Sequence, residues 1–189
     1  SLIGLVHSNS GNHSEALSCS LQALDCYRGT GHRIDEGNML NTIASIYHEL
    51  GDTDRAIVNY EAAMNANAQL NRPDFDAITL ANVASLRAER GEFDTAIEIG
   101  ERALALCRMH AVGFLPEVLA ALAGAYGGRG EFDQARTLLN AALAMLDASS
   151  VSFDDAVRSS VELAFGRVEL SAKNDAEALS HFCRALGLA

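Results

Sequence analysis

The side chains best suited to chemistry are four cysteines and six histidines, and their spacing fits no complete catalytic or metal-binding motif. Cys107 and His110 lie one helical turn apart, but no second pair completes a tetrahedral metal site. His48 is followed by glutamate without the second histidine of a zinc-protease helix, and the Gly-Gly-Arg-Gly run at 127–130 lacks the Lys-Ser/Thr of a phosphate loop. We therefore expect a segment that is not an enzyme and that holds no metal and no cofactor.

The cysteines show no Cys-x-x-Cys pairing, and each falls on a largely apolar segment with helical spacing. This pattern favours buried free thiols in a reducing cytoplasm over a disulfide or redox role. The four residues are Cys19, Cys26, Cys107 and Cys183.

The chain is acidic, with 25 Asp and Glu against 14 Lys and Arg, a net charge of −11. Many acids fall in short stretches between apolar segments, where they either cap helix N-termini or form an acidic edge for a basic partner. Because a phosphate backbone would be repelled, nucleic acid is not an expected partner. With no signal peptide and no apolar run of roughly 20 residues, we expect a soluble cytoplasmic protein that makes no membrane contact.

The elements that position these residues are revealed by small residues that recur at steps of 40, 40, 39 and 43. Such a period is typical of stacked helical repeats, in which Ala and Gly allow two helices to cross closely. The three columns are Gly4, Ala44, Ala84, Ala123, Gly166; Ala16, Ala56, Ala96, Ala135, Ala178; and Ala23, Ala63, Ala103, Ala142, Ala185.

Apolar residues between the columns follow helical spacing, so each repeat is predicted to be a helix, a tight turn and a second helix. The predicted hairpins span about 1–28, 35–70, 74–110, 115–147 and 153–187, in one domain covering 1–189. Gly11, Gly51, Gly91 and Gly130 are expected to take the left-handed conformation at the turns, with Asn174 in that role in the fifth repeat. Pro73 and Pro116 suit a first helical turn, and residues 152–155 resemble a capping box.

The order Leu40, Ile43-Ala44, Tyr47, Gly51, Ala56, Tyr60, Ala63-Met64, and its counterpart from Leu119 to Leu143, resembles the tetratricopeptide repeat. The resemblance covers essentially the whole chain and implies an all-α fold, an α-α superhelix or solenoid of about five hairpins. The step is longer than the usual 34 residues, as in kinesin light chains and peptide-sensing bacterial regulators. Because the first hairpin lacks an opening turn and no polar helix closes the last, we expect an excised part of a longer protein.

In that family the first helix of each pair lines a concave groove, so the resemblance implies that a protein or peptide binds there. Asn side chains donate and accept hydrogen bonds at once and suit the main chain of an extended peptide. Family members that bind a carboxy-terminal chaperone tail use several Lys and Arg at such places, and because these positions carry only Arg167, the resemblance argues against that ligand. The alternative is that these positions are merely the solvated side of the helices. The matching residues are Asn38, Asn41, Ser45, His48, Asn82, Ser85, Glu89 and Arg167.

The fourth repeat differs because Ala120, Gly124 and Gly128 form a small-residue ridge on one helical face. Glycine inside a helix costs about 1 kcal/mol relative to alanine, so close approach of another segment is expected to compensate. Either a helix of a partner, a second copy or the parent protein lies on this ridge, or neighbouring repeats of the chain itself approach it. Self-approach is the interpretation that we favour.

Together these features predict a non-catalytic protein or peptide interaction module, the recognition or sensory region of a larger bacterial signalling or regulatory protein. One alternative is a peptide-gated switch that controls an attached DNA-binding or cyclic-nucleotide-synthesising domain. A second alternative is a structural segment that forms a homodimer.

Overall fold

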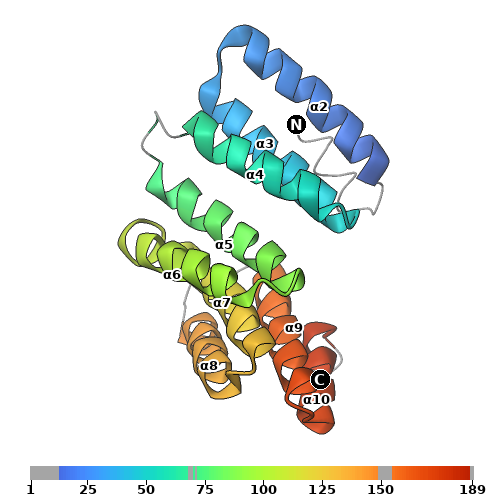
Figure 1. The fold of residues 1–189 in the computed structure, drawn as a ribbon, viewed down its shortest axis with the longest axis vertical. Coiled ribbons are helices and arrows are strands. Elements are labelled where there is room, and N and C mark those ends of the chain that lie inside the picture. Colours follow the sequence, from blue (N-terminus) through green and yellow to red (C-terminus); the bar gives the residue numbers. More distant parts are fainter. Residues whose placement is uncertain (1–12, 68–69, 71, 149–154, 188–189) are drawn as a thin grey trace. The chain divides into compact units, whose positions relative to one another are not determined.

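The computed structural model describes residues 13–67, 70, 72–148 and 155–187, and within these ranges the chain forms helices and no strand (Figure 1). The predicted all-α class is therefore confirmed for the described residues. The chain divides into two units, residues 1–75 and 76–189, and the boundary falls inside α5 (Pro73–Glu89). The predicted arrangement of five hairpins in one domain stays a prediction.

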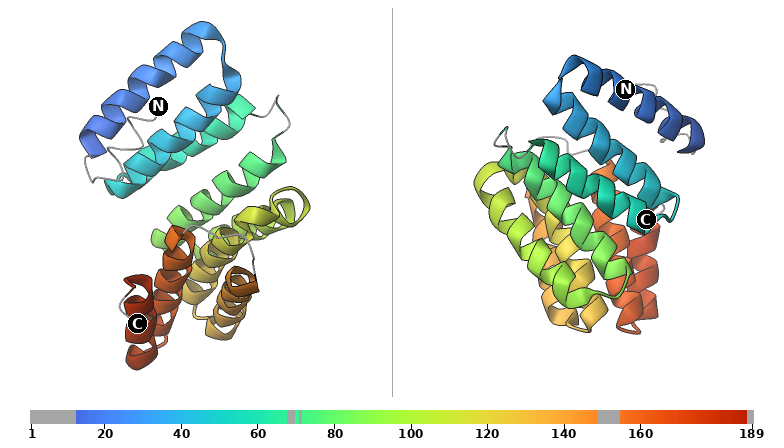
Figure 2. Two further views of the ribbon diagram at one scale, coloured as in Figure 1. Left: turned by 180° about the vertical axis from the view of Figure 1, so that it is seen from behind. Right: turned by 45° about the horizontal axis from the view of Figure 1, so that its top comes forward.

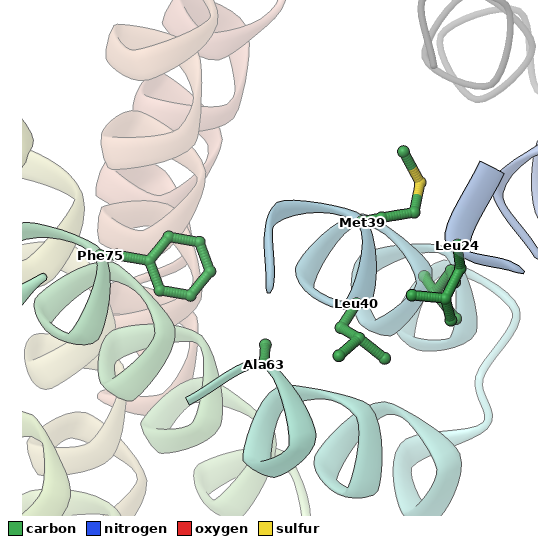
Figure 3. Close-up of a cluster of buried hydrophobic side chains, with 6 residues drawn as sticks. Leu24, Met39, Leu40, Ala63 and Phe75 are labelled. Atoms are coloured by element: carbon green, nitrogen blue, oxygen red, sulfur yellow. The ribbon is translucent and has the colours of Figure 1, made fainter. Parts of the chain in front are cut away.

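The first unit is built from α2 (His13–Thr30), α3 (Arg33–Glu49) and α4 (Thr53–Asn67). Helix α3 packs against both of the others, as Figure 2 shows from two sides. The apolar core of the first unit is formed by residues from all three helices and from the start of α5 (Figure 3). The core residues are Leu24, Met39, Leu40, Ile43, Ala63 and Phe75.

The second unit continues α5 and adds one short and five long helices (Figure 1). Each long helix after α5 packs on its successor, and α7 also packs directly against α9. The contact between α7 and α9 places the first helices of the last two helical pairs side by side. The elements are α6 (Phe93–His110), the 3₁₀ turn η2 (Val112–Phe114), α7 (Leu115–Arg129), α8 (Phe132–Ala148), α9 (Asp155–Ser171) and α10 (Asp175–Ala185).

The recurring small residues lie at helix crossings, as their spacing predicts. Of the fourteen column positions that the structure describes, all but Ala23 and Ala185 are buried, and those two are half-buried. Gly4 lies outside the described residues. At Gly166 the reason for a small residue is direct, because a Cβ there would collide with the Phe182 ring of α10. The columns therefore mark contacts that a larger side chain would force apart.

One turn geometry ends α3, α5, α7 and α9. In α7 the Gly130 amide donates to the Gly127 carbonyl at 3.1 Å and the next amide donates to the Tyr126 carbonyl at 2.9 Å, which is the Schellman arrangement. Gly51, Gly91 and Gly130 take the left-handed conformation there, with φ of 77°, 77° and 90°. The predicted role of these three glycines is confirmed, while Gly11 lies outside the described residues.

The prediction for the fifth repeat was wrong by one residue. Lys173, and not Asn174, adopts the left-handed conformation, with φ of 64° against −98° for Asn174. Lys173 stands five residues before Ala178, as each of the three turn glycines stands five residues before its own column alanine. The repeat register therefore decides which residue is left-handed, and an unfavourable residue type at that place does not move the turn.

The helix starts confirm the predicted positions of the two prolines and show that the acidic residues between helices do not all cap a helix N-terminus. Pro73 opens α5 and Pro116 lies in the first turn of α7, where a missing N–H breaks no intrahelical bond. The Asp52 carboxylate caps α4 by accepting the Arg55 amide at 3.0 Å. Glu92 makes no such cap on α6, because its carboxylate is held by arginines of the preceding turn. The proposed capping box at 152–155 falls almost wholly outside the described residues.

Candidate functional site

Four of the predicted binding residues lie on α3 in the first unit. Asn38 is exposed, whereas Asn41, Ser45 and His48 are half-buried. The Ser45 hydroxyl lies 3.0 Å from the hydroxyl of buried Tyr60 on α4, so this serine helps to hold the hairpin together. Burial raises the pKa of Tyr60. Ser45 therefore has a structural partner that its residue type alone did not reveal.

The other predicted residues lie in the second unit. On α5, Asn82 and Ser85 are half-buried and Glu89 is exposed, and on α9 Arg167 is exposed. Arg167 occupies the position in α9 that Gly124 occupies in α7, 43 residues earlier. Because α7 and α9 pack side by side, these two positions belong to neighbouring helices.

The small-residue ridge of α7 is not uniform. Ala120 is buried, with 7% of its surface exposed. A Cβ on Gly128 would lie against the Phe93 ring of α6, so the chain itself fills that place. Around Gly124, in contrast, no described atom outside the adjacent residues and backbone of its own helix comes within 4 Å of the Cβ position, and the residue is exposed. Self-approach of the chain, the interpretation that the sequence favoured, holds at Gly128 and is wrong at Gly124 within the described residues.

Close contacts explain the other helix-interior glycines of this unit. A Cβ on Gly100 of α6 would lie 2.8 Å from Cδ1 of Leu122, and one on Gly127 would lie 2.8 Å from Cγ2 of Val168 in α9. Gly127 is accordingly buried against α9. Among these described glycines, Gly124 alone has both a helical position and open space beside it.

A buried charged cluster joins α9 to α10, and sequence reasoning missed it. His181 Nδ1 lies 2.6 Å from Glu162 Oε2, and both side chains are less than a tenth exposed. The His181 ring stacks on Phe165 with centroids 4.0 Å apart, while Arg184 reaches the same carboxylate at 3.6 Å. Because these contacts join side chains of α9 and α10, we assign the cluster to holding α10 on α9.

A second buried glutamate, seven residues further along α9, anchors this helix to α8. Glu169 accepts two hydrogen bonds from the Arg136 guanidinium, at 2.7 and 2.8 Å, and one from Asn174 at 2.7 Å. These bonds, that of Arg136 foremost, lower the pKa of Glu169 to about 2. The seven-residue spacing of Glu162 and Glu169 was the available signal, since it places both on one face of the helix.

The cysteines form no disulfide, but only one of them is as buried as predicted. Cys107 is buried, its thiol donates to the Ala111 carbonyl at 3.0 Å, and desolvation raises its pKa. Cys19 and Cys183 are half-buried, and Cys26 is exposed because it lies on the outer side of α2. The prediction of burial was wrong for Cys26, since its local apolar surroundings did not show which side α3 covers.

Two features of the described ranges bear on the class of site. No group of three or more His, Cys, Asp and Glu side chains is arranged there to hold a metal ion. Among the described helices, none combines the length and the apolar character needed to cross a membrane.

Comparison with known proteins identifies the repeat. The model of the family described as "Tetratricopeptide repeat" matches residues 1–69 and 35–109. Response regulator aspartate phosphatase H of Bacillus subtilis (strain 168) is 31% identical over 104 residues, which is 54% of this chain. The match spans only 28% of the length of that relative.

Solved structures agree at the level of the fold. BtubC (BKLC) from P. vanneervenii has a TM-score of 0.70 at 21% identity, covering 98% of this chain and 76% of that one. Aspartyl phosphate phosphatase F from Bacillus subtilis has a TM-score of 0.73 at 15% identity, covering 98% of this chain and 57% of the other. The family match extends over more than half of the chain, and the described helices have the paired arrangement of this fold. The chain belongs to the tetratricopeptide repeat family.

Proposed function

We propose that this chain is a non-catalytic module that binds a protein or peptide, and that it is the recognition region of a larger cytoplasmic protein of bacterial regulation. The family match and the regulatory phosphatase relative support this class of function. The observation that carries the proposal at the level of residues is the open position beside Gly124 on α7.

The argument rests on what a helix-interior glycine costs. Each such glycine destabilises a helix by about 1 kcal/mol relative to alanine. At Gly100, Gly127, Gly128 and Gly166 a neighbouring side chain occupies the space, so packing offsets that cost. At Gly124 nothing in the described chain does so. A ligand whose backbone approaches α7 closely would supply the missing contact.

The polar residues on α5 in the same unit suit the same ligand. Asn82 and Ser85 are half-buried. Amide and hydroxyl groups pair with the main chain of an extended peptide without selecting its charge. We therefore propose that the ligand is held mainly through its backbone.

Selection from a random peptide display library against the chain 1–189 tests this proposal. The selected peptides should lose about tenfold or more in affinity when Gly124→Leu fills the open position. Asn140→Leu is the matched control, because it places the same side chain on an exposed position of α8. Failure to select any peptide, or equal binding to the Gly124→Leu protein, would refute the proposal.

A second candidate, the peptide-gated switch, is favoured by the relative whose name combines a response regulator with a phosphatase. In such a protein the repeats would control an activity located elsewhere in the polypeptide. Small-angle scattering of the chain with a selected peptide discriminates: a changed radius of gyration supports a switch, and an unchanged one supports simple docking. Stable dimers whose formation does not change when the peptide is added would instead favour the structural segment that forms a homodimer.

A further inference from the structure

The connection between α6 and α7 presents large apolar side chains to solvent. Met109 near the end of α6 is 66% exposed, and Val112 and Phe114 in η2 are 55% and 46% exposed. Arg108 and His110, on either side of Met109 in the sequence, are exposed as well. These five residues are called the corner below. They fall within seven consecutive residues, so they lie close together.

Phe114 is exposed although its counterpart in the preceding repeat is buried. Phe75 and Phe114 each stand nine residues before a column alanine, Ala84 and Ala123 respectively. Phe75 is 8% exposed and belongs to the core of the first unit. In the fourth repeat the 3₁₀ turn Val112–Phe114 stands at the register position where α5 and α9 begin with an α-helical turn. A residue type that packs inward in one repeat is thus left in solvent in the next.

The corner is positively charged, although the chain as a whole has a net charge of −11. Residues 102–116 include two arginines and a histidine and no aspartate or glutamate. Neither Arg102 nor Arg108 makes an ion pair with any residue in the described ranges. Glu117, the next acid along the chain, has its Oε2 atom buried and pairs with neither arginine. The corner therefore combines exposed apolar side chains with an unpaired cation.

We propose that the corner is a docking surface for a segment of a partner protein that carries a large apolar side chain flanked by aspartate or glutamate. The apolar side chain would cover Met109, Val112 and Phe114, and the acids would pair with Arg108 and with Arg102. This surface is distinct from the proposed peptide site, because Gly124 lies nine residues after the start of α7, about 14 Å along the helix axis.

An anionic membrane suits the corner less well than a protein segment does. A bilayer extends over far more than the Debye length of about 8 Å, so it would also meet the repulsion of the acids elsewhere on the chain. A short segment contacts the corner alone, where the charge is positive. Charge complementarity therefore favours an acidic protein segment.

A second copy that docks symmetrically is also disfavoured. A two-fold axis through the corner would bring the Arg108 side chains of the two copies together. Burying like charges at one point opposes such a dimer. The corner accordingly suits a partner of opposite charge.

Peptide display with counter-selection tests this assignment. Peptides from a random library are selected on the chain 1–189, after removal of those that also bind the Met109→Ser/Phe114→Ser protein. The remaining peptides should carry aspartate or glutamate next to a large apolar residue. In fluorescence anisotropy, Arg108→Glu and Met109→Ser should each weaken their binding about tenfold. If circular dichroism shows that the double variant does not fold, Met109→Ser alone serves for the counter-selection.

Matched controls lie elsewhere on the chain. Val58→Ser changes an apolar side chain of α4 that is 63% exposed, and Arg33→Glu changes an exposed arginine of α3. Neither should alter the binding of the corner peptides. Gly124→Leu should leave it unchanged too, whereas peptides of the proposed peptide site should still bind the Met109→Ser/Phe114→Ser protein. Failure of the one surface is therefore distinguishable from failure of the other.

Several outcomes would overturn the inference. It fails if no selected peptide depends on the corner, if the corner-dependent peptides lack acidic residues, or if Arg108→Glu leaves their binding unchanged. Binding to phosphatidylserine vesicles that Phe114→Ser abolishes would overturn it in favour of a membrane. Wild-type dimers that Phe114→Ser dissociates would overturn it in favour of a second copy.

Discussion

Replacing Lys173 with glycine is expected to stabilise the second unit. Lys173 adopts φ of 64° at the turn between α9 and α10, where the other three repeats have glycine. In this left-handed region the Cβ of an L-residue crowds the following carbonyl oxygen. Its side chain is exposed, so the substitution removes that crowding without removing a buried contact.

The size of the effect follows from two opposing contributions. The left-handed conformation costs a residue with a Cβ about 1–2 kcal/mol, which glycine does not incur. Glycine in turn loses about 0.5–1 kcal/mol more in backbone entropy on folding. The net gain in the free energy of unfolding is therefore about 0.5–1 kcal/mol. For a chain of this size, each kcal/mol corresponds to about 2–4 °C in Tm.

Urea titration followed by far-UV circular dichroism measures the change, with thermal unfolding as a second readout. Lys173→Ala is the control, because it removes the charged side chain and keeps the Cβ. Gly130→Ala supplies the opposite test, since φ of 90° at that turn should make the alanine protein less stable by about 1 kcal/mol. If the glycine and alanine proteins at position 173 are equally stable, the strain attributed to this turn is absent.

Two further predictions concern helix contacts in the second unit. Gly166→Ala should lower the free energy of unfolding by about 1–3 kcal/mol because its Cβ meets the Phe182 ring. Gly124→Ala should raise the free energy of unfolding by up to about 1 kcal/mol, because the space beside it is open. Equal effects of the two substitutions in urea titration would contradict the assignment of a close contact to Gly166 and of open space to Gly124. Glu169, with a pKa lowered from 4.5 to about 2, stabilises the fold above pH 4.5 and loses that contribution as the pH falls towards 2. Acid titration of Glu169→Gln should therefore show a flatter loss of stability over this range than the wild type does, and parallel curves would refute the Arg136 pairing as its cause.

Much of the fold was predictable because the same pattern of residues recurs in every repeat, so that signals which are weak in one repeat agree across several. Ala44, Ala84 and Ala123 are each weak signals, but their common spacing identifies one type of helix crossing, and all three are buried. The same register predicts the left-handed conformation at Lys173, since this residue stands five positions before Ala178. Asparagine tolerates the left-handed conformation better than lysine does, but in this turn the register, and not the residue type, decides which residue adopts it.

The candidate site was less predictable because it depends on neighbours that are distant in sequence. Whether Gly124 or Gly128 faces open space is decided by Phe93, 35 residues before Gly128, and no spacing rule places that ring. Ser45 was assigned to a ligand, although its hydroxyl meets Tyr60 of the next helix. Residues whose partners lie on another helix require the packing of the helices before their roles can be assigned.

The cluster of Glu162, His181, Phe165 and Arg184 has a consequence for how such chains diverge. Removing one member of a buried charged pair costs about 3–5 kcal/mol, whereas replacing the whole set with apolar residues of similar volume is often neutral. Intermediate sequences that lack a single member would be purged, because that loss is a large part of the stability of a domain. Descendants of this sequence should therefore carry the set intact or lack it altogether, so that these positions co-vary as one inherited block.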